Sequence, residues 1–310
     1  MVLSLLGMGC DHNPVSPSVG TFQLPATTIP PLVTTPTATV IDVRESGPLS
    51  TRGLNFYDQS GNRWQWRGVS SFLLFKRYLD GEDITEYIRT YQAVGANTFR
   101  IFGRARNISS FNPTNYPSYF SSLSRLSDFL ASLGVRMEFT ALVDAQDMTD
   151  AQQTQFVNQI YNALQGHWNV FVEICNECEP NGVFQSFNSP TNGILASAGS
   201  GAGCSPPRSP LNGSSAPFAY ATYHDCRSSD WWEHPGILYA GVPTVSDEPM
   251  GASETFVNGR RDNNPSHFYR FGQNAKWWGA TFHSEPGLRA ELPGPITLEC
   301  AKMMFKGMME

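Results

Sequence analysis

From about Val40 onwards, short apolar strand patterns alternate with amphipathic helical patterns along the chain. Residues 82–95, for example, carry apolar side chains on one helical face and stop at Gly95, and residues 97–102 then form a strand pattern. Repeated strand–helix units of this kind pack as a parallel sheet with right-handed crossovers. This alternation restricts the chain to the α/β class more strongly than any other feature of the sequence.

The number of strand patterns is eight, which favours closure into a barrel over an open sheet. Strands are expected at residues 64–71, 97–102, 135–143, 169–175, 194–197, 218–223, 242–246 and 280–283. Helices are expected at residues 82–95, 116–134, 151–164, 230–240, 265–278 and 295–309. No Gly-x-Gly-x-x-Gly follows the first strand, which argues against a dinucleotide-binding fold. The predicted fold is a (β/α)8 TIM barrel in residues 40–310, close to the usual size of about 250 residues.

Residues 1–39 have a different composition. Residues 13–38 are rich in Pro, Thr and Ser, which is typical of a disordered, extended linker that cannot form a core. The first ten residues are a short apolar stretch that ends in Cys10 and resembles a bacterial lipoprotein signal. They contain no basic residue, and Gly7 stands where that signal usually has Leu, so an N-terminus without such a signal is the alternative. We expect a secreted or cell-surface protein, with a lipid anchor at Cys10 under the first alternative.

Charge and hydropathy exclude two classes of partner. The net charge is −6, which gives no general basic surface for nucleic acid. No run approaches the 18 or more apolar residues of a membrane span. The chain is rich in aromatic residues, at 12%, and these can serve a core or a flat ligand. We expect a monomer without a nucleic-acid partner or a transmembrane segment.

Polar residues stand at the carboxyl ends of five predicted strands, where the chemistry of such barrels lies. These residues are Arg100, Asn176-Glu177, Tyr223-His224, Asp247-Glu248 and His283-Ser284-Glu285. Two of the ends offer carboxylates that would face each other across one mouth. Cleavage of a glycosidic bond needs such a pair, because one carboxyl protonates the leaving oxygen and the other traps the oxocarbenium-like centre.

Three motifs resemble the retaining (β/α)8 glycoside hydrolases of clan A, such as the family 5 cellulases and mannanases. They are Asn97-Thr-Phe-Arg-Ile101, Glu173-Ile-Cys-Asn-Glu177 and Val242-Pro-Thr-Val-Ser-Asp-Glu248. The resemblance implies that Glu177 is the acid/base and that Glu248, five residues after Pro243, is the nucleophile. It implies a retaining glycosidase acting on a β-linked poly- or oligosaccharide, and no metal or organic cofactor.

The chain departs from that pattern in two places. The usual Asn-Glu-Pro is Asn-Glu-Cys-Glu-Pro, with Cys178 and Glu179 before Pro180. The end of the eighth strand carries His283, where the clan often has a Trp that stacks on sugar. Both departures affect the expected class of substrate more than the expected type of reaction.

The proposed chemistry sets requirements on both carboxyl groups. Burial and the nearby nucleophile should raise the pKa of Glu177, so that it is protonated near neutral pH. Glu248 must stay ionised, with Arg100 as one donor and Tyr223 or His224 as the second. The two carboxyl groups should lie about 5 to 5.5 Å apart.

Further roles follow for neighbouring residues. Asn176 is expected to donate to the sugar 2-hydroxyl. Trp231 and Trp232 are candidate sugar platforms, with core packing of at least one of them as the alternative. Asp247 should point away from Glu248 by strand alternation. Glu285 is a rival nucleophile or a substrate contact.

The six cysteines are too few for a disulfide scaffold. Cys175 and Cys178 form a C-x-x-C, but without a second such pair or a nearby His they do not indicate zinc, and Cys175 is expected to be a buried apolar strand residue. Cys204 and Cys226 follow the fifth and sixth strands and could pair as a disulfide in an exported protein or remain as two thiols.

Two alternatives remain from the sequence. One is a non-catalytic carbohydrate-binding or surface-structural protein on the same barrel. The other is an inverting hydrolase, which a wider separation of the two carboxyl groups would indicate.

Overall fold

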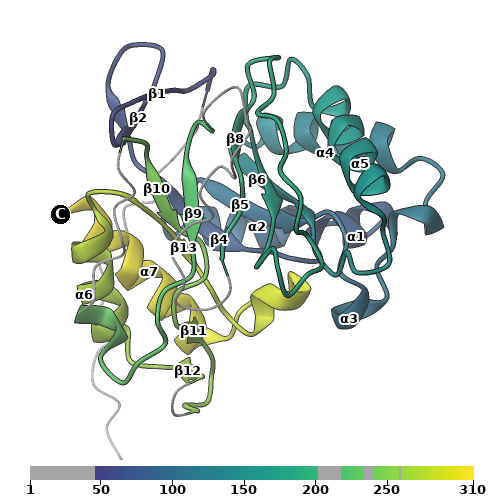
Figure 1. Cartoon of the computed structure of the whole chain (residues 1–310). Coiled ribbons are helices and arrows are strands. Elements are labelled where there is room, and N and C mark those ends of the chain that lie inside the picture. The colour runs from purple at the N-terminus through teal and green to yellow at the C-terminus, as the bar shows by residue number, and fades with distance from the viewer. Residues whose placement is uncertain (1–45, 202–217, 234–240, 258–259) are drawn as a thin grey trace, which may run out of the picture. The chain divides into compact units, whose positions relative to one another are not determined.

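The computed structural model of the chain describes residues 46–201, 218–233, 241–257 and 260–310 (Figure 1). The expected linker and signal-like start, residues 1–39, lie outside the described residues, as does Cys204. The division of the chain at residue 39 therefore stays a prediction.

Eight parallel strands form one sheet in the order β8-β7-β6-β5-β4-β13-β10-β9. Their bounds are β4 Arg67–Ser70, β5 Thr98–Phe102, β6 Arg136–Leu142, β7 Val170–Cys175, β8 Leu195–Ser197, β9 Ala221–Tyr223, β10 Thr244–Ser246 and β13 Gly279–Phe282. The first strand of this series, β4, pairs with both β5 and the last strand, β13, as closure requires.

The barrel is nearly closed at its one remaining seam, between β8 and β9. The backbone N–H groups of Ala219 and Tyr220 donate to the carbonyl oxygen of Ala196, at 2.9 and 3.4 Å. The hydroxyl oxygens of Ser197 and Thr222 lie 3.2 Å apart across the same seam. The predicted (β/α)8 barrel is therefore confirmed.

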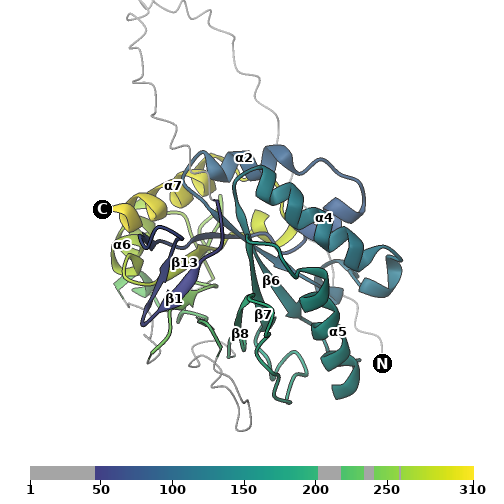
Figure 2. The same cartoon turned by 90° about the horizontal axis from the view of Figure 1, so that it is seen from above.

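The helices lie outside the strands. They are α1 Leu74–Leu79, α2 Thr85–Gln92, α3 Arg106–Ser109, α4 Tyr119–Ser132, α5 Asp150–Ala163, α6 Pro265–Ala275 and α7 Pro295–Met309, with 3-10 turns η1 Pro113–Asn115, η2 Trp231–Glu233 and η3 Pro286–Arg289. Figure 2 shows α6, α7, α2, α4 and α5 in an arc around the barrel. No helix lies between β7 and β8, or in the described residues between β8 and β9, so loops form that side. No described helix is long and apolar enough to cross a membrane.

The expected helices are confirmed with three differences, one of which is the unexpected short helix α3. The helix expected at 230–240 is only the 3-10 turn η2 in its described part, since residues 234–240 lie outside the described ranges. The short helix α1 was also not expected from the sequence. The apolar residues at its start continue directly from those of the preceding strand, so the pattern shows no boundary between the two elements.

Aromatic rings fill the amino-terminal end of the barrel. A small antiparallel sheet of β1 Ser50–Arg52, β2 Asn55–Tyr57 and β3 Arg63–Trp64 lies at this end. Its rings Phe56 and Trp64 pack with Trp66, Phe171 and Tyr220 in one buried cluster. Trp64 and Trp66 thus lie at the floor of the barrel, and the strand expected at 64–71 is divided into β3 and β4. A second small sheet pairs β11 Gly251–Ala252 with β12 Arg261–Asp262.

The closest helix contact, between α6 and α7, gives a stability prediction. A Cβ at Gly272 would overlap the backbone oxygen of Met304, so Gly272→Ala must separate the two helices. We expect a loss of about 1–3 kcal/mol in the free energy of unfolding, against the usual gain from a Gly-to-Ala change in a helix. Urea unfolding measures it, with the exposed Asn158→Ala on α5 as the control within about 0.5 kcal/mol of wild type. A stabilised Gly272→Ala would contradict the close contact.

Candidate active site

Arg100, on β5, lies fully buried at the centre of an acidic cluster. Its Nε and Nη2 donate to Glu173 Oε2, at 3.1 and 2.7 Å, and Nη1 donates to Glu248 Oε1 at 3.0 Å. Nη2 also donates to Asn176 Oδ1 at 2.9 Å and lies 3.1 Å from Asp247 Oδ2. The expected contact of Arg100 with Glu248 is present, but through one oxygen, because the guanidinium is shared among several acceptors.

Strand alternation explains why these side chains meet. Neighbouring parallel strands place the side chains of matched positions on the same face, so Arg100 and Glu173 both point to the barrel axis. Thr140 Oγ1 of β6 and Thr222 Oγ1 of β9 donate to the two oxygens of Glu173, at 2.7 and 2.9 Å. Glu138 of β6 lies 3.8 Å from Arg100 Nε. The axis of the barrel is therefore polar, and both oxygens of Glu173 accept hydrogen bonds.

The carboxyl groups around Arg100 differ in protonation. Burial and the charge of Glu173 raise the pKa of Glu138 to about 8, and burial raises that of Asp247 well above its usual range. Burial acts in the same direction on Glu173, but the charge of Arg100 and hydrogen bonds from Asp247 and Thr140 outweigh it and lower the pKa. At neutral pH, Glu138 and Asp247 are thus protonated and Glu173 is a carboxylate.

Glu177 occupies the turn that follows β7, and its backbone is left-handed, with φ of 38°. This region is uncommon for a side chain of this size and is found where surrounding contacts enforce it. The backbone N–H of Glu177 donates to Ser200 Oγ at 3.1 Å. Its side chain is 34% exposed, against 12% for Glu248, so Glu177 faces the mouth of the barrel.

His224 lies between the two candidate catalytic carboxyl groups. Its Nδ1 is 3.3 Å from Glu177 Oε1 and 3.7 Å from Glu248 Oε2. Adding these two distances limits the separation of the two carboxyl oxygens to about 7 Å. The structure therefore brings Glu177 and Glu248 together at one mouth.

Glu248 is held as a carboxylate. Burial would raise its pKa, but His224 and His283 in their charged forms and the guanidinium groups of Arg100 and Arg227 outweigh burial and lower the pKa far below its usual range. Burial lowers the pKa of His283 itself to about 3, so that ring is neutral at pH 7. The two guanidinium groups are permanent charges, and Arg227 Nη2 lies 3.3 Å from Glu248 Oε2. No motif or spacing in the sequence predicted a role for Arg227.

This chain is similar to known proteins in fold and not in sequence. No protein-family model and no curated protein sequence matches the chain. Solved structures with the same fold include a glycoside hydrolase family 5 protein from Bacteroides vulgatus, at 12% identity and a TM-score of 0.57. The match covers 78% of this chain and 64% of that one.

A β-glucanase from Saccharophagus degradans, in complex with cellotetraose, matches at 13% identity and a TM-score of 0.60, over 87% of this chain and 95% of the other. A β-1,4-mannanase from the sea hare Aplysia kurodai matches at 11% identity and a TM-score of 0.52, over 84% and 95%. The chain has the fold of the family 5 glycoside hydrolases. At these identities the likeness concerns the fold, and the site must be judged on its own geometry.

The expectation for Asp247 was wrong. Asp247 and Glu248 both contact Arg100, at 3.1 and 3.0 Å, although strand alternation would separate them. The reason is that β10 ends at Ser246, so the two residues follow the strand and alternation does not extend to them.

Of the two alternatives for the second partner of Glu248, Tyr223 makes no hydrogen bond to Glu248 among the described residues, and His224 is the nearer group. Thr222 of β9 points to the axis and donates to Glu173, so Tyr223 must point to the other face of the sheet. Its buried hydroxyl lies beside Ser246 and Asp225, and burial raises its pKa. His224, on the same face as Thr222, is the residue that reaches the carboxyl groups.

Trp231 is part of the core and not a sugar platform. It is 1% exposed, packs against the rings of Phe268 and Phe271, and donates from Nε1 to Asp262. Trp232 stacks on the His267 ring of α6, with ring centroids 3.5 Å apart, so one of its faces is covered. A run of two aromatic residues does not reveal which face of a turn will be buried.

The strand-eight residues differ in position. His283 is buried, and its Nδ1 lies 3.1 Å from Ser70 Oγ. Glu285 is 60% exposed and pairs with Arg261 at 3.1 Å. Within the described residues Glu285 has no contact with Arg100 or Glu248, which removes the reason for treating it as a rival nucleophile.

The interpretation of the cysteines needs correction. Cys175 is buried, as expected, but it forms a disulfide with Cys178, because the turn at Glu177 brings their Cα atoms to 5.1 Å. Cys226 is also disulfide-bonded. Cys300 is a free, buried thiol.

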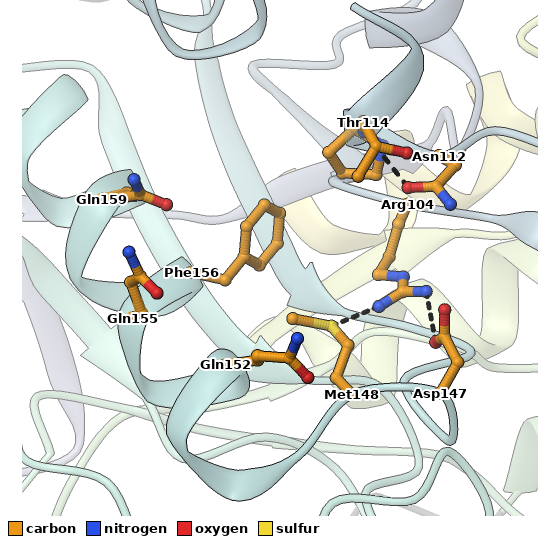
Figure 3. Close-up of a pocket in the computed structure, with 10 residues that line it drawn as sticks. Arg104, Asn112, Thr114, Asp147, Met148, Gln152, Gln155, Phe156 and Gln159 are labelled. Carbon is orange, nitrogen blue, oxygen red and sulfur yellow. Dashed lines mark hydrogen bonds and ion pairs between the residues drawn. The ribbon is translucent and has the colours of Figure 1, made fainter.

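A hollow of about 250 Å³ lies between the loops that follow β5 and β6, at the same end of the barrel as Glu177 (Figure 3). Its lining is Arg104, Asn112, Pro113, Thr114, Asp147, Met148, Gln152, Gln155, Phe156 and Gln159. Arg104 Nη2 donates to Asp147 Oδ1 at 2.7 Å, so the charge of Arg104 is paired, although Asp147 is shared with Arg106. The hollow therefore presents mainly amides and one aromatic ring, which suits an uncharged polar ligand.

The raised pKa of Glu138 gives a test of the buried cluster. The folded protein keeps this proton up to a pH of about 8, whereas the unfolded chain releases it near 4.5, so wild type loses stability as the pH rises through this interval. Glu138→Gln keeps an acceptor for the Tyr220 hydroxyl and does not titrate. It should match wild type at pH 5 and exceed it by about 1–3 kcal/mol at pH 9.

Urea unfolding at pH 5, 7 and 9 measures this difference, with the exposed Glu86→Gln as the control. A stability difference between Glu138→Gln and wild type that is constant over this range would contradict a protonated Glu138.

Proposed function

We propose that the protein is a retaining glycoside hydrolase that cleaves O-glycosidic bonds of a β-linked poly- or oligosaccharide. The observation that carries the proposal is the pair Glu177 and Glu248, which share His224 as a neighbour but differ in environment. Glu248 is buried and held ionised by guanidinium groups, while Glu177 faces the mouth. A pair in unlike environments suits one nucleophile and one proton donor.

The reaction divides into two steps. In the first, Glu177 gives its proton to the glycosidic oxygen while Glu248 attacks the anomeric carbon, and an ester between sugar and Glu248 forms. In the second, the Glu177 carboxylate takes a proton from water, which attacks the same carbon and releases Glu248. Glu248 Oε1 accepts from Arg100, so Oε2 is the oxygen on the side of Glu177 and His224.

The contact with Arg100 fixes the orientation of the Asn176 side-chain amide. A guanidinium only donates, so the amide must present Oδ1 to Arg100 and keep Nδ2 free to donate to substrate. This orientation is the one required to bind the sugar 2-hydroxyl, a contact expected to strengthen in the transition state.

The limit of about 7 Å between the carboxyl oxygens includes the retaining separation and only the lower end of the inverting range. Inverting enzymes need room for a water molecule and separate the carboxyl groups by about 6.5–9.5 Å, whereas retaining enzymes need about 5–5.5 Å. The named activities of the similar structures, on a β-glucan and a β-1,4-mannan, suggest these substrate classes first. The amide-lined hollow beside the mouth could contact further sugar units.

Two disulfides support export of the protein. The bond between Cys175 and Cys178 and the one formed by Cys226 are expected in an oxidising compartment. A secreted or cell-surface location is therefore part of the proposal, and a lipid anchor at Cys10 stays a prediction.

Isosteric substitution tests the two carboxyl groups. Glu248→Gln should abolish hydrolysis of the glycan that wild type cleaves best among β-glucans, mannans, xylans and galactans. Glu177→Gln should lower kcat about 10²- to 10⁴-fold, since it loses general acid catalysis. Reducing-sugar release measures both, and Glu299→Gln on α7, where the side chain is 44% exposed, is the control with unchanged activity.

If wild type binds a glycan in this panel but cleaves none, the alternative of a non-catalytic carbohydrate-binding protein is favoured. Full activity in either Gln variant would overturn the assignment of that residue.

The stereochemistry of the first product is a separate test. Proton NMR of the reaction mixture within the first minutes should detect the β-anomer, because two inversions at the anomeric carbon retain its configuration. Initial release of the α-anomer would instead identify an inverting enzyme with the same two carboxyl groups.

A further inference from the structure

A disulfide encloses the two residues that are proposed to act on the glycosidic bond. Cys175, the last residue of β7, is bonded to Cys178, and the ring contains Asn176 and Glu177. Both sulfur-bearing residues are fully buried. The covalent link therefore lies directly beneath the proposed acid/base.

The turn inside this ring needs external support. Glu177 adopts a left-handed backbone without being glycine, which costs of the order of 1 kcal/mol or more and persists only where the surroundings enforce it. Three hydrogen bonds join the turn to Ser200. The backbone N–H of Cys178 donates to the Ser200 carbonyl oxygen at 3.2 Å, and the Ser200 N–H donates to the Cys175 carbonyl oxygen at 3.2 Å. The N–H of Glu177 donates to the Ser200 hydroxyl oxygen at 3.1 Å. The disulfide and Ser200 together fix the backbone from which the Glu177 side chain extends.

The chain after β8 also packs directly on the disulfide. A Cβ at Gly199 would overlap the carbonyl oxygen of Cys175 and would lie 2.8 and 2.9 Å from the sulfur atoms of Cys175 and Cys178. Two thiols need more room than one disulfide, because non-bonded sulfur atoms stand further apart. Reduction must therefore move the turn that carries Glu177 or the segment at Gly199.

We propose that Cys175 and Cys178 are positioning residues whose disulfide holds Glu177 in the geometry for proton transfer. A dithiol would supply two electrons and two protons, the S–S bond would break, two thiols would form, and the dithiol would be oxidised to its own disulfide. The reduced enzyme keeps Glu248 and its guanidinium partners but loses the alignment of Glu177. This inference rests on the proposed glycosidase function.

The leaving group of the substrate separates positioning from general damage. A 2,4-dinitrophenyl glycoside needs no protonation to leave, whereas a phenyl glycoside does. In Cys175→Ala/Cys178→Ala we expect kcat/KM for the phenyl glycoside to fall about 10- to 100-fold, part of the usual contribution of general acid catalysis, and about threefold or less for the dinitrophenyl glycoside. Glu177→Gln should give the same signature with a larger loss.

Cys300→Ala is the matched control, because it removes a buried thiol from α7 and should leave both substrates unchanged. Equal losses on both substrates, or no loss on either, would overturn the positioning role. Absence of hydrolysis by the wild type would instead overturn the proposed function.

Gly199→Ala keeps the experiment decisive if the double variant does not fold, as judged by circular dichroism. It disturbs the same contact with both cysteines intact, so it should reproduce the loss that is selective for the phenyl glycoside. An unselective loss or full activity in this variant would also contradict the inference.

Discussion

Arg100 places a permanent positive charge on the axis of the barrel, where four carboxyl groups from two strands and one strand end surround it. A buried guanidinium is tolerated only when its donors are paired, and a buried carboxylate only when it is neutralised or protonated. Glu173 and Glu248 are the ionised partners, and Glu138 and Asp247 remain protonated. The four carboxyl groups differ in protonation because a single guanidinium group cannot neutralise all of them.

The same interaction organises the mouth above it. Arg100 fixes the oxygen of Asn176 and helps to keep Glu248 ionised, whereas Glu177 is oriented by its turn and by His224. The two proposed catalytic groups thus depend on different supports. The guanidinium supports the nucleophile, and the disulfide-bonded turn supports the acid/base.

The rest of the barrel protects this arrangement. Rings such as Trp66 and Phe171 fill the amino-terminal end, so the polar axis meets solvent at the carboxyl end, where the mouth is. Helices cover β4 to β7, β10 and β13, while loops cover the side of β8 and β9. The turn of Glu177 and the segment of Ser200 pack together on this loop-covered side, where local hydrogen bonds replace helix packing.

The sequence by itself determined the order of strands and helices, because hydrophobic periodicity is local, and it located Arg100, Glu177 and Glu248 at strand ends. It did not determine which other groups reach the axis. Glu138 and Glu173 stand in apolar strands, where a single charge signals a buried partner without naming it. Several other features depend on where strands end and on how turns fold back: the contacts of Asp247 and Arg227, the burial of Trp231, and the bond between Cys175 and Cys178. Only the tertiary structure decided these, since they arise from packing between segments far apart in the chain.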